Sequence, residues 1–346
     1  MAKKTIYDSY SKAIDDISNN SSIMIGGFGV QGGQPTNLMI ALRDMNLIDL
    51  TLIGNVAGIS MITGYGWKKS DRKKISNSPP KMISTGKGRT TCAYFMPDGK
   101  HILYASTHLG DSMCPEAPLR LDGEYVWPIY ETYDIFVSDL EGNIVNQLTN
   151  ELGYDAEATV SPKGDKIVFT SMRTGDLELF TMNIDGSDVR QITNEVGYDG
   201  GAFFSPDGTK IIFRASRPKT EDEIRQYKEL LNDGFVVPTE LEIFICDADG
   251  SNLRQLTYLG NANWSPFWHP SGEKILFSSN FQAKAGFPFN IYMIDIDGRN
   301  LKQVTFDNMF DSFPVFSNDG KYLVFSSNRN NGGNRDTNIF IAEWKN

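Results

Sequence analysis

Five copies of one short motif constrain the fold of this 346-residue chain more than any other feature. Each copy is a tight turn around a glycine, most completely Ser205-Pro206-Asp207-Gly208, followed by an apolar strand such as residues 210–213. Asp-Gly between two apolar runs favours a two-residue hairpin, because such turns need positive φ angles. Tandem copies of one supersecondary unit indicate a repeat architecture. The glycines of the five turns are Gly99, Gly164, Gly208, Gly272 and Gly320.

A second motif completes each unit: an apolar strand, a turn that ends in glycine, and a short strand that ends in threonine. The four copies end in Gln147-Leu148-Thr149, Gln191-Ile192-Thr193, Gln255-Leu256-Thr257 and Gln303-Val304-Thr305. The shortest interval between units is close to the roughly 40–45 residues of a four-stranded propeller blade. Blades packed around an axis cover one another's faces. The sequence therefore predicts a mainly β fold, a five-bladed β-propeller or an incomplete six-bladed one, preceded by a small N-terminal α/β segment.

Closure of the ring can also be predicted. The fifth unit has three strands and lacks its Gln-x-Thr strand, whereas residues 81–85, just before the first unit, resemble that strand. We expect residues 81–85 to pair with residues 339–341, because a ring left open has two exposed sheet edges. The alternative is that residues 81–85 are only the end of a linker.

Two insertions interrupt the units. Residues 107–132 contain several prolines and are expected to form an irregular loop. Within residues 217–240, residues 221–232 have apolar side chains at helical spacing with charges on the other face, which predicts a short amphipathic helix ending near Asp233. Insertions in repeat proteins map to loops on one face, which is often the binding face.

The first 80 residues contain no repeat. They show a βαβ pattern, in which a glycine-rich run follows the first strand, and they end in a basic and proline-rich stretch. We predict three parts: an α/β segment at residues 1–67, a linker at residues 68–80 and a propeller at residues 81–346.

The glycine run Gly27-Phe28-Gly29-Val30-Gln31-Gly32 fits the dinucleotide-binding pattern. The second strand, however, ends in Gly54-Asn55, where a ribose-binding acid is expected. A better match comes from the order of the elements, with Phe28-Gly29 in the glycine run and Asn55-Val56-Ala57-Gly58 after the second strand. Over roughly residues 3–60 this order resembles the start of the α subunit of 3-oxoacid CoA-transferases.

That resemblance implies a CoA-binding loop, formed by Gly27, Gly29, Gly32 and Pro35. In the family the nucleophilic glutamate belongs to the β subunit, and residues after 80 do not continue the pattern. The resemblance therefore implies, as an alternative function, a component for acetate or 3-oxoacid CoA transfer that needs a separate β subunit. CoA transfer is the only enzyme class that the sequence indicates.

Residues 81–346 resemble the TolB-type propeller family, on the Ser-Pro-Asp-Gly copies and on Asp-Gly-Ser-x-x-x-Gln-x-Thr copies such as residues 185–193. The resemblance implies a protein or peptide partner and a periplasmic or exported location. Related propellers often have six blades. No secretory signal is apparent at the N-terminus, so the sequence as written favours the cytoplasm.

The strand that opens each blade is expected to line the central channel. Charged side chains on these strands and near the ends of the second strands would gather at the channel mouth, namely Asp155, Glu157, Asp199, Asp311, Arg173 and Arg214. Converging charges in a concave site are a default binding hypothesis. The alternative is that these groups only solvate the pore and pair with one another.

Charge and composition narrow the function. Residues 1–80 carry nine Lys/Arg and six Asp/Glu, and the remainder carries 24 and 37. Such an acidic propeller argues against nucleic acid as the partner. No apolar run approaches the roughly 20 residues of a membrane span.

Catalytic and metal sites are not predicted. The chain has no Gly-x-Ser-x-Gly nucleophile motif. His108, Cys92 and Cys114 are residue types that bind zinc, but their spacing is irregular and no fourth ligand is evident. The sequence therefore predicts a non-catalytic binding module without a cofactor, for a peptide, a protein or a small polar ligand at the channel mouth.

Overall fold

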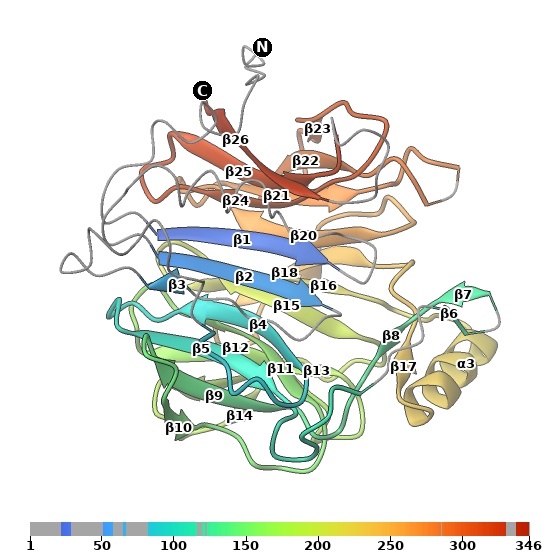
Figure 1. Cartoon of the computed structure of the whole chain (residues 1–346). Coiled ribbons are helices and arrows are strands. Elements are labelled where there is room, and N and C mark those ends of the chain that lie inside the picture. The colour runs from blue at the N-terminus through green and yellow to red at the C-terminus, as the bar shows by residue number, and fades with distance from the viewer. Residues whose placement is uncertain are drawn as a thin grey trace.

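The computed structural model of this chain confirms a mainly β protein with five blades (Figure 1). It describes the backbone of three N-terminal segments and nearly all of the repeat region: residues 22–28, 51–57 and 65–66, then residues 82–115, 120–121, 123–284, 286–329 and 337–345. No helix in these ranges is long and apolar enough to cross a membrane.

Each of the first four blades is an antiparallel sheet of four strands. Blade 1 contains β4 (Thr90–Phe95), β5 (His101–Ser106), β9 (Asp134–Asp139) and β10 (Ile144–Gln147). Blade 2 contains β11 (Asp155–Val160), β12 (Lys166–Ser171), β13 (Glu178–Asn183) and β14 (Arg190–Gln191). Blade 3 contains β15 (Asp199–Phe204), β16 (Lys210–Ala215), β18 (Glu242–Asp247) and β19 (Arg254–Gln255).

Blade 4 contains β20 (Asn263–Trp268), β21 (Lys274–Ser279), β22 (Asn290–Asp295) and β23 (Lys302–Gln303). Blade 5 has three strands, β24 (Asp311–Phe316), β25 (Tyr322–Ser327) and β26 (Asn338–Glu343). The first strands of successive blades contact one another in the order β4, β11, β15, β20, β24 and so form the inner wall of the ring. Apolar clusters fill the spaces between neighbouring blades.

The repeated turns have the geometry that the sequence predicts. Gly208 has a φ of 68°, and the Asp207 carboxylate accepts hydrogen bonds from the Thr209 N–H and the Ser205 hydroxyl. The turns between the third and fourth strands also end in a glycine of positive φ, for example at Gly250, where φ is 88°. Both turn motifs thus shape the blades.

The threonine of each Gln-x-Thr strand fastens that strand to its blade. In blade 3, the Thr257 hydroxyl accepts the Ile243 N–H at 2.8 Å and donates to the Glu242 carboxylate. Gln255 donates from its side-chain amide to the Thr257 carbonyl at 2.7 Å. Because the fourth strands are only two to four residues long, these side-chain bonds supplement a short ladder. We call this arrangement the Gln-x-Thr clasp; it recurs around Thr149, Thr193 and Thr305.

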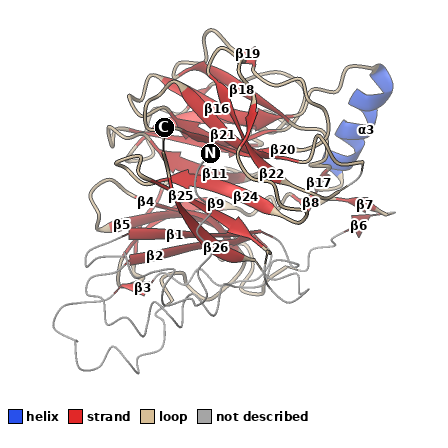
Figure 2. Ribbon diagram, turned by 90° about the horizontal axis from the view of Figure 1, so that it is seen from above, coloured by secondary structure: helices blue, strands red, loops and turns tan. Residues whose placement is uncertain are grey.

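The amphipathic helix is confirmed as α3 (Glu221–Asn232), which lies at the margin of the blades (Figure 2). Its N-terminus has a complete capping box, in which Thr220 accepts the Glu223 N–H and Glu223 accepts the Thr220 N–H. Asp233 caps its C-terminus. Local signals therefore set both ends of this helix.

The first insertion contains more structure than the expected irregular loop. Strands β6 (Arg120–Leu121) and β7 (Glu124–Tyr125) form a small hairpin. β8 (Trp127–Pro128) pairs with β17 (Phe235–Val236), which follows α3 in the second insertion. The two insertions are therefore joined to each other by a short sheet.

Replacing Thr220 with alanine is expected to destabilise α3 by about 1 kcal/mol, because one first-turn N–H loses its acceptor. Amides of the first turn should then exchange with solvent about fivefold faster, while amides of β12 keep their protection. Equal exchange rates in Thr220→Ala and the wild type would show that the capping box contributes nothing to the helix.

The predicted ring closure is wrong. Residues 82–85 form no strand, and β26 pairs with β25 alone among the described strands. Ile83 is instead 1% exposed and packs into blade 1. Its carbonyl lies against the blade 1 turn at Gly142, as the Leu148 carbonyl lies against the blade 2 turn at Gly186. Residues 82–85 therefore lie against blade 1 as the end of one blade's fourth strand lies against the next blade. Because Ile83 is buried there, these residues are not available to pair with β26.

The N-terminal strands lie between blade 5 and blade 1. β1 (Ser22–Phe28) and β2 (Thr51–Ala57) are parallel, as the βαβ pattern predicts, and β3 (Tyr65–Gly66) pairs antiparallel to β2. β1 contacts β25 and β2 contacts β4 (Figure 1). The helices predicted beside these strands, and the whole of the predicted linker at residues 68–80, lie outside the described residues.

Candidate binding site at the centre of the ring

All six charged residues predicted at the channel mouth come from first strands or from the ends of second strands. The first strand of each blade begins, and its second strand ends, at the end of the ring that carries both insertions. We call this end the insertion face. The sequence analysis predicted these residues at one end of the ring. In the structure they form two kinds of ion pair, one within a blade and one between blades.

The first kind lies within one blade. Asp155 is 2% exposed, and its carboxylate accepts from the Arg173 guanidinium at 2.9 Å. The guanidinium also lies 5.3 Å from the centre of the Phe169 ring. Equivalent pairs in blades 3 and 5 are Asp199–Arg217 and Asp311–Arg329. Each buried aspartate therefore has a cationic partner, as the alternative interpretation of these charges expected.

Arg217 and Arg329 were not predicted. A sequence signal for them exists, because an arginine stands four residues after the phenylalanine of the second strand in these three blades: Phe169 and Arg173, Phe213 and Arg217, Phe325 and Arg329. His108 and Phe281 hold this position in blades 1 and 4.

The second kind of pair connects two blades at the centre of the ring. Glu157 of β11 has a φ of 57°, and its carboxylate accepts from the Arg214 guanidinium of β16 at 2.7 Å. It also accepts from the Tyr198 hydroxyl and the Gly201 N–H, both at 2.8 Å. Burial by itself raises the pKa of Glu157, but Arg214 and these hydrogen bonds lower it below its ordinary value. Glu157 therefore stays ionised although its side chain is only 13% exposed.

Arg214 reaches Glu157 because Gly201 leaves room. A Cβ atom at Gly201 would lie 1.8 Å from Nη1 of Arg214, and the φ of 62° also favours glycine. The third residue of the first strand has positive φ in all five blades, at Cys92, Glu157, Gly201, Ser265 and Phe313. The pair Glu157–Arg214 thus depends on the third residue of two neighbouring first strands: a glutamate in blade 2 and a glycine, Gly201, in blade 3.

Trp127 of the first insertion covers this pair. Its ring lies over the Arg214 guanidinium at 5.2 Å, and its centroid is 5.5 Å from that of Trp264. Trp264 in turn donates to the Pro238 carbonyl of the second insertion at 2.8 Å. Both insertions therefore join an apolar cluster with the inner strands and shield Glu157 and Arg214 from the insertion face.

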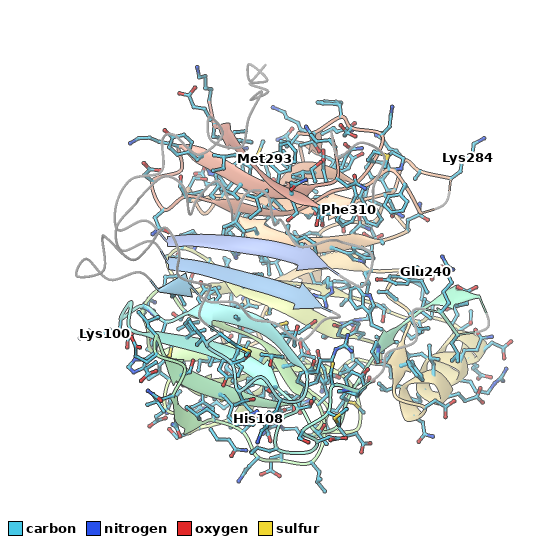
Figure 3. All side chains as sticks on the ribbon, viewed as in Figure 1. Lys100, His108, Glu240, Lys284, Met293 and Phe310 are labelled. Carbon is cyan, nitrogen blue, oxygen red and sulfur yellow. The ribbon has the colours of Figure 1, made fainter. Side chains whose placement is uncertain are left out.

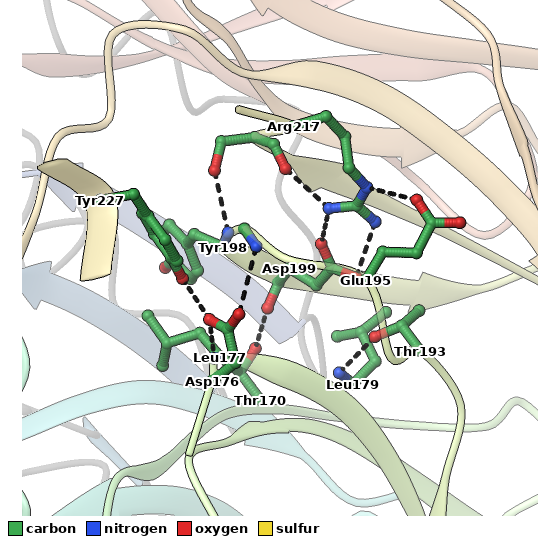
Figure 4. Close-up of polar contacts among 12 residues, drawn as sticks. Thr170, Asp176, Leu177, Leu179, Thr193, Glu195, Tyr198, Asp199, Arg217 and Tyr227 are labelled. Carbon is green, nitrogen blue, oxygen red and sulfur yellow. Dashed lines mark hydrogen bonds and ion pairs between the residues drawn. The ribbon is translucent and has the colours of Figure 1, made fainter. Parts of the chain in front are cut away.

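Acidic side chains gather beside this cluster where α3 meets blades 2 and 3 (Figure 4). The Tyr227 hydroxyl of α3 donates to Asp176, and Arg217 pairs with Asp199. Burial, Asp199 and Asp176 raise the pKa of Glu178 to about 8, although a hydrogen bond from Thr193 opposes them. Burial raises the pKa of Asp199 to about 6 against the effect of Arg217. Oε2 of Glu178 has no hydrogen-bond partner among the described residues.

Three large aromatic side chains are exposed on the insertion face. Tyr258, Phe306 and Phe287 are 77%, 76% and 60% exposed, in the loops after β19, β23 and β21. Phe287 extends from an aromatic cluster that includes Phe310, which is labelled in Figure 3. The ring centroids of Phe287 and Phe310 are 6.2 Å apart. Asn261, in the same loop as Tyr258, donates to the Ala283 carbonyl and so links two of these loops. We call the three side chains the aromatic rim.

The other groups considered from the sequence are the cysteines and the glycines of the CoA loop. Cys92, Cys114 and Cys246 form no disulfide bond with one another. No group of three His, Cys, Asp or Glu side chains in the ranges given above is arranged to hold a metal ion. Of the predicted CoA loop, Gly27 lies in β1, whereas Gly29, Gly32 and Pro35 lie outside the described residues.

The fold defines the class of this protein: a mainly β, five-bladed propeller built from turn and clasp repeats, with a small parallel sheet contributed by the N-terminal segment. Comparison with known proteins agrees with both parts. Residues 129–235 match the family model of the TolB beta propeller domain. Residues 7–106 match that of Coenzyme A transferase, which extends past the predicted limit near residue 60 to the end of β5.

Among curated proteins, one of the subunits of 3-oxoadipate CoA-transferase from Pseudomonas putida is 43% identical over 58 residues. The match covers 17% of this chain and 24% of that protein, so the chain spans about a quarter of that relative's length.

Among solved structures, TolB from Acinetobacter baumannii matches at 15% identity and a TM-score of 0.46, over 95% of this chain and 94% of that one. The propeller domain of the Trilobed protease from Pyrococcus furiosus, described as having an open velcro topology, matches at 14% identity and a TM-score of 0.44. That match covers 74% of this chain and 69% of the other.

Proposed function

We propose that this protein is a non-catalytic binding module whose partner is a protein or an extended peptide that docks on the insertion face. The aromatic rim carries this proposal, because Tyr258, Phe287 and Phe306 are each more than half exposed. Their loops are joined by hydrogen bonds, from Asn261 to the Ala283 carbonyl and from the Phe289 N–H to the Met309 carbonyl. Several large aromatic side chains exposed at one end of a protein are typical of interaction sites. A partner with apolar side chains would remove them from water.

The ion pairs at the same end of the ring suit a second contact. A ligand that moves Trp127 aside would meet Glu157 and Arg214, with Asp155–Arg173, Asp199–Arg217 and Asp311–Arg329 around them. Because each carboxylate has a cationic partner, these groups favour hydrogen bonding to a peptide backbone over attraction of a strongly basic ligand. The predicted site residues therefore remain candidates for ligand contact, alongside the aromatic rim.

Selection of peptides from a displayed random library on the immobilised full chain tests this proposal. Peptides that bind should lose at least tenfold in affinity on Tyr258→Ala or Phe306→Ala. Tyr322→Ala is the matched control, because Tyr322 is also exposed but begins β25 at the opposite end of the ring. Selected peptides that bind the rim variants as tightly as the wild type would refute docking at the aromatic rim.

A second candidate function rests on the N-terminal match to CoA-transferases. It is a component for CoA transfer that contributes a CoA loop and acts with a separate β subunit. Calorimetric titration of the full chain with CoA and acyl-CoA, followed by transfer assays with an added β subunit, separates the two candidates. We expect no heat and no turnover; saturable heat with turnover would favour the second candidate.

A further inference from the structure

We propose that the free edge of β26 is a docking site for an extended segment of the sequence Gln-apolar-Thr, donated by a partner protein. This site differs from the aromatic rim and does not depend on the proposed function. Four filled examples within the same molecule show which chemistry the site accepts.

Blade 4 provides the template for this site. The Thr305 hydroxyl accepts the Ile291 N–H at 2.9 Å and donates to the Asn290 side-chain carbonyl at 3.3 Å. The Val304 N–H donates to the Ile291 carbonyl at 2.8 Å. Gln303 donates from its side chain to the Thr305 carbonyl, which completes the clasp. One residue of the third strand, Ile291, thus has both backbone groups engaged by the fourth strand.

Blade 5 offers the same groups in the same register. Asn338 and Ile339 of β26 pair with Ser327 and Ser326 of β25, as Asn290 and Ile291 of β22 pair with Ser279 and Ser278 of β21. The amide of Asn338 therefore corresponds to that of Asn290. By this register, the backbone N–H and C=O groups of Ile339 and Ile341 point away from β25. The described residues supply no threonine and no strand to them.

The occupant must come from elsewhere than the described repeats. Their four Gln-x-Thr strands are all used in their own blades. Residues 82–85, which resemble such a strand, are held against blade 1 by the buried Ile83. Adding a strand to an open edge is a common mode of peptide recognition, in which the main chain provides affinity and alternate side chains provide specificity. Here the clasp specifies glutamine and threonine on either side of an apolar residue.

A direct test uses a peptide copied from blade 4. A fluorescein-labelled peptide with the sequence of residues 299–306, Arg-Asn-Leu-Lys-Gln-Val-Thr-Phe, should bind the full chain saturably in a fluorescence anisotropy titration. The same peptide with valine in place of threonine keeps the shape but loses two hydrogen bonds, so its affinity should fall about tenfold. Equal affinity of both peptides, or no binding of either, would overturn the proposal.

Variants of β26 locate the site. Asn338→Leu should weaken binding about tenfold, whereas Asn338→Asp should retain it, because Asp134 makes the equivalent contact with Thr149 in blade 1. Ile341→Pro should abolish binding with little loss of thermal stability, since it removes an N–H that faces the free edge. Met293→Pro, the matched change in the filled blade 4, should lower the melting temperature markedly.

Two further results distinguish the possible outcomes. Tyr258→Ala should leave the affinity for the peptide of residues 299–306 unchanged. A negative result for docking at the aromatic rim can therefore be distinguished from a negative result for docking at β26. Hydrogen exchange of the free protein should show fast exchange at the Ile339 and Ile341 amides and slower exchange once the peptide binds. Protection of both amides in the free monomer, or only in a dimer seen by size-exclusion chromatography, would mean that the chain itself fills the edge, and would refute a partner-donated strand.

Discussion

Replacing Glu157 with leucine is expected to lower the free energy of unfolding by about 3–5 kcal/mol, because it leaves the Arg214 guanidinium buried without its counter-charge. Arg214 is 8% exposed beneath Trp127, and its Nε has no hydrogen-bond partner among the described residues. Water therefore cannot replace the lost carboxylate. Urea denaturation followed by tryptophan fluorescence measures the change, and Trp127 itself reports on this region.

A double-mutant cycle controls this prediction. Arg214→Met alone should also be strongly destabilising, since it leaves the buried Glu157 carboxylate without its cation. The double variant Glu157→Leu with Arg214→Met should be more stable than the sum of the single effects predicts, by at least about 2 kcal/mol. Additive single effects would show that the two groups do not act as a pair in the folded protein.

Replacing Glu178 with glutamine is expected to stabilise the folded protein more at pH 8 than at pH 6.5. The gain in the free energy of unfolding, relative to the wild type, should be about 2 kcal/mol larger at pH 8. The pKa of Glu178 is about 8 in the folded state, well above the roughly 4.3 of an unfolded chain. Between these values the unfolded state loses the proton while the folded state keeps it, so stability falls as pH rises and levels off above pH 8. A glutamine cannot ionise, and its amide can donate toward Asp199 and Asp176.

The window from pH 6.5 to 8 isolates this effect, because Asp199 has a pKa of about 6 and completes most of its own titration below that range. The measurement is the urea midpoint of the wild type and Glu178→Gln across this range. Glu195→Gln is the control, since Glu195 belongs to the same group of acidic residues, where it pairs with Arg217, but is 58% exposed. If the wild type shows no loss of stability between pH 6.5 and 8, Glu178 is already ionised in the folded protein.

Local features of the fold could be predicted because they depend on neighbouring residues. The turn at Gly208 follows from the conformational freedom of glycine, and the limits of α3 follow from the Thr220 capping box and from the residues around Asp233. The Gln-x-Thr strands could be recognised because they recur, although their role as clasps was visible only once Thr257 was seen beside Ile243. Repetition and local propensity were therefore sufficient for the class of fold.

The charged residues of the candidate site could be recognised only in part. Asp155 and Arg173 were predicted from their strand positions, and their role in ligand binding stays a prediction. Arg217 and Arg329 were missed, although an arginine follows the second-strand phenylalanine by four residues in all three blades. The aromatic rim was missed as well, because exposure of Tyr258 or Phe306 depends on what else covers the loop. No local sequence pattern indicates whether a side chain in such a loop is exposed in the folded protein.

By itself, the sequence determined the turns and strands of the five repeated units and the helix of the second insertion, all of which arise from contacts between residues close in the chain. Only the tertiary structure decided how distant segments meet. It paired β8 with β17, brought Arg214 of one blade to Glu157 of the next, and placed Ile83 against blade 1 instead of β26. These contacts depend on which faces become buried when the blades pack around an axis, and burial is a property of the assembled ring.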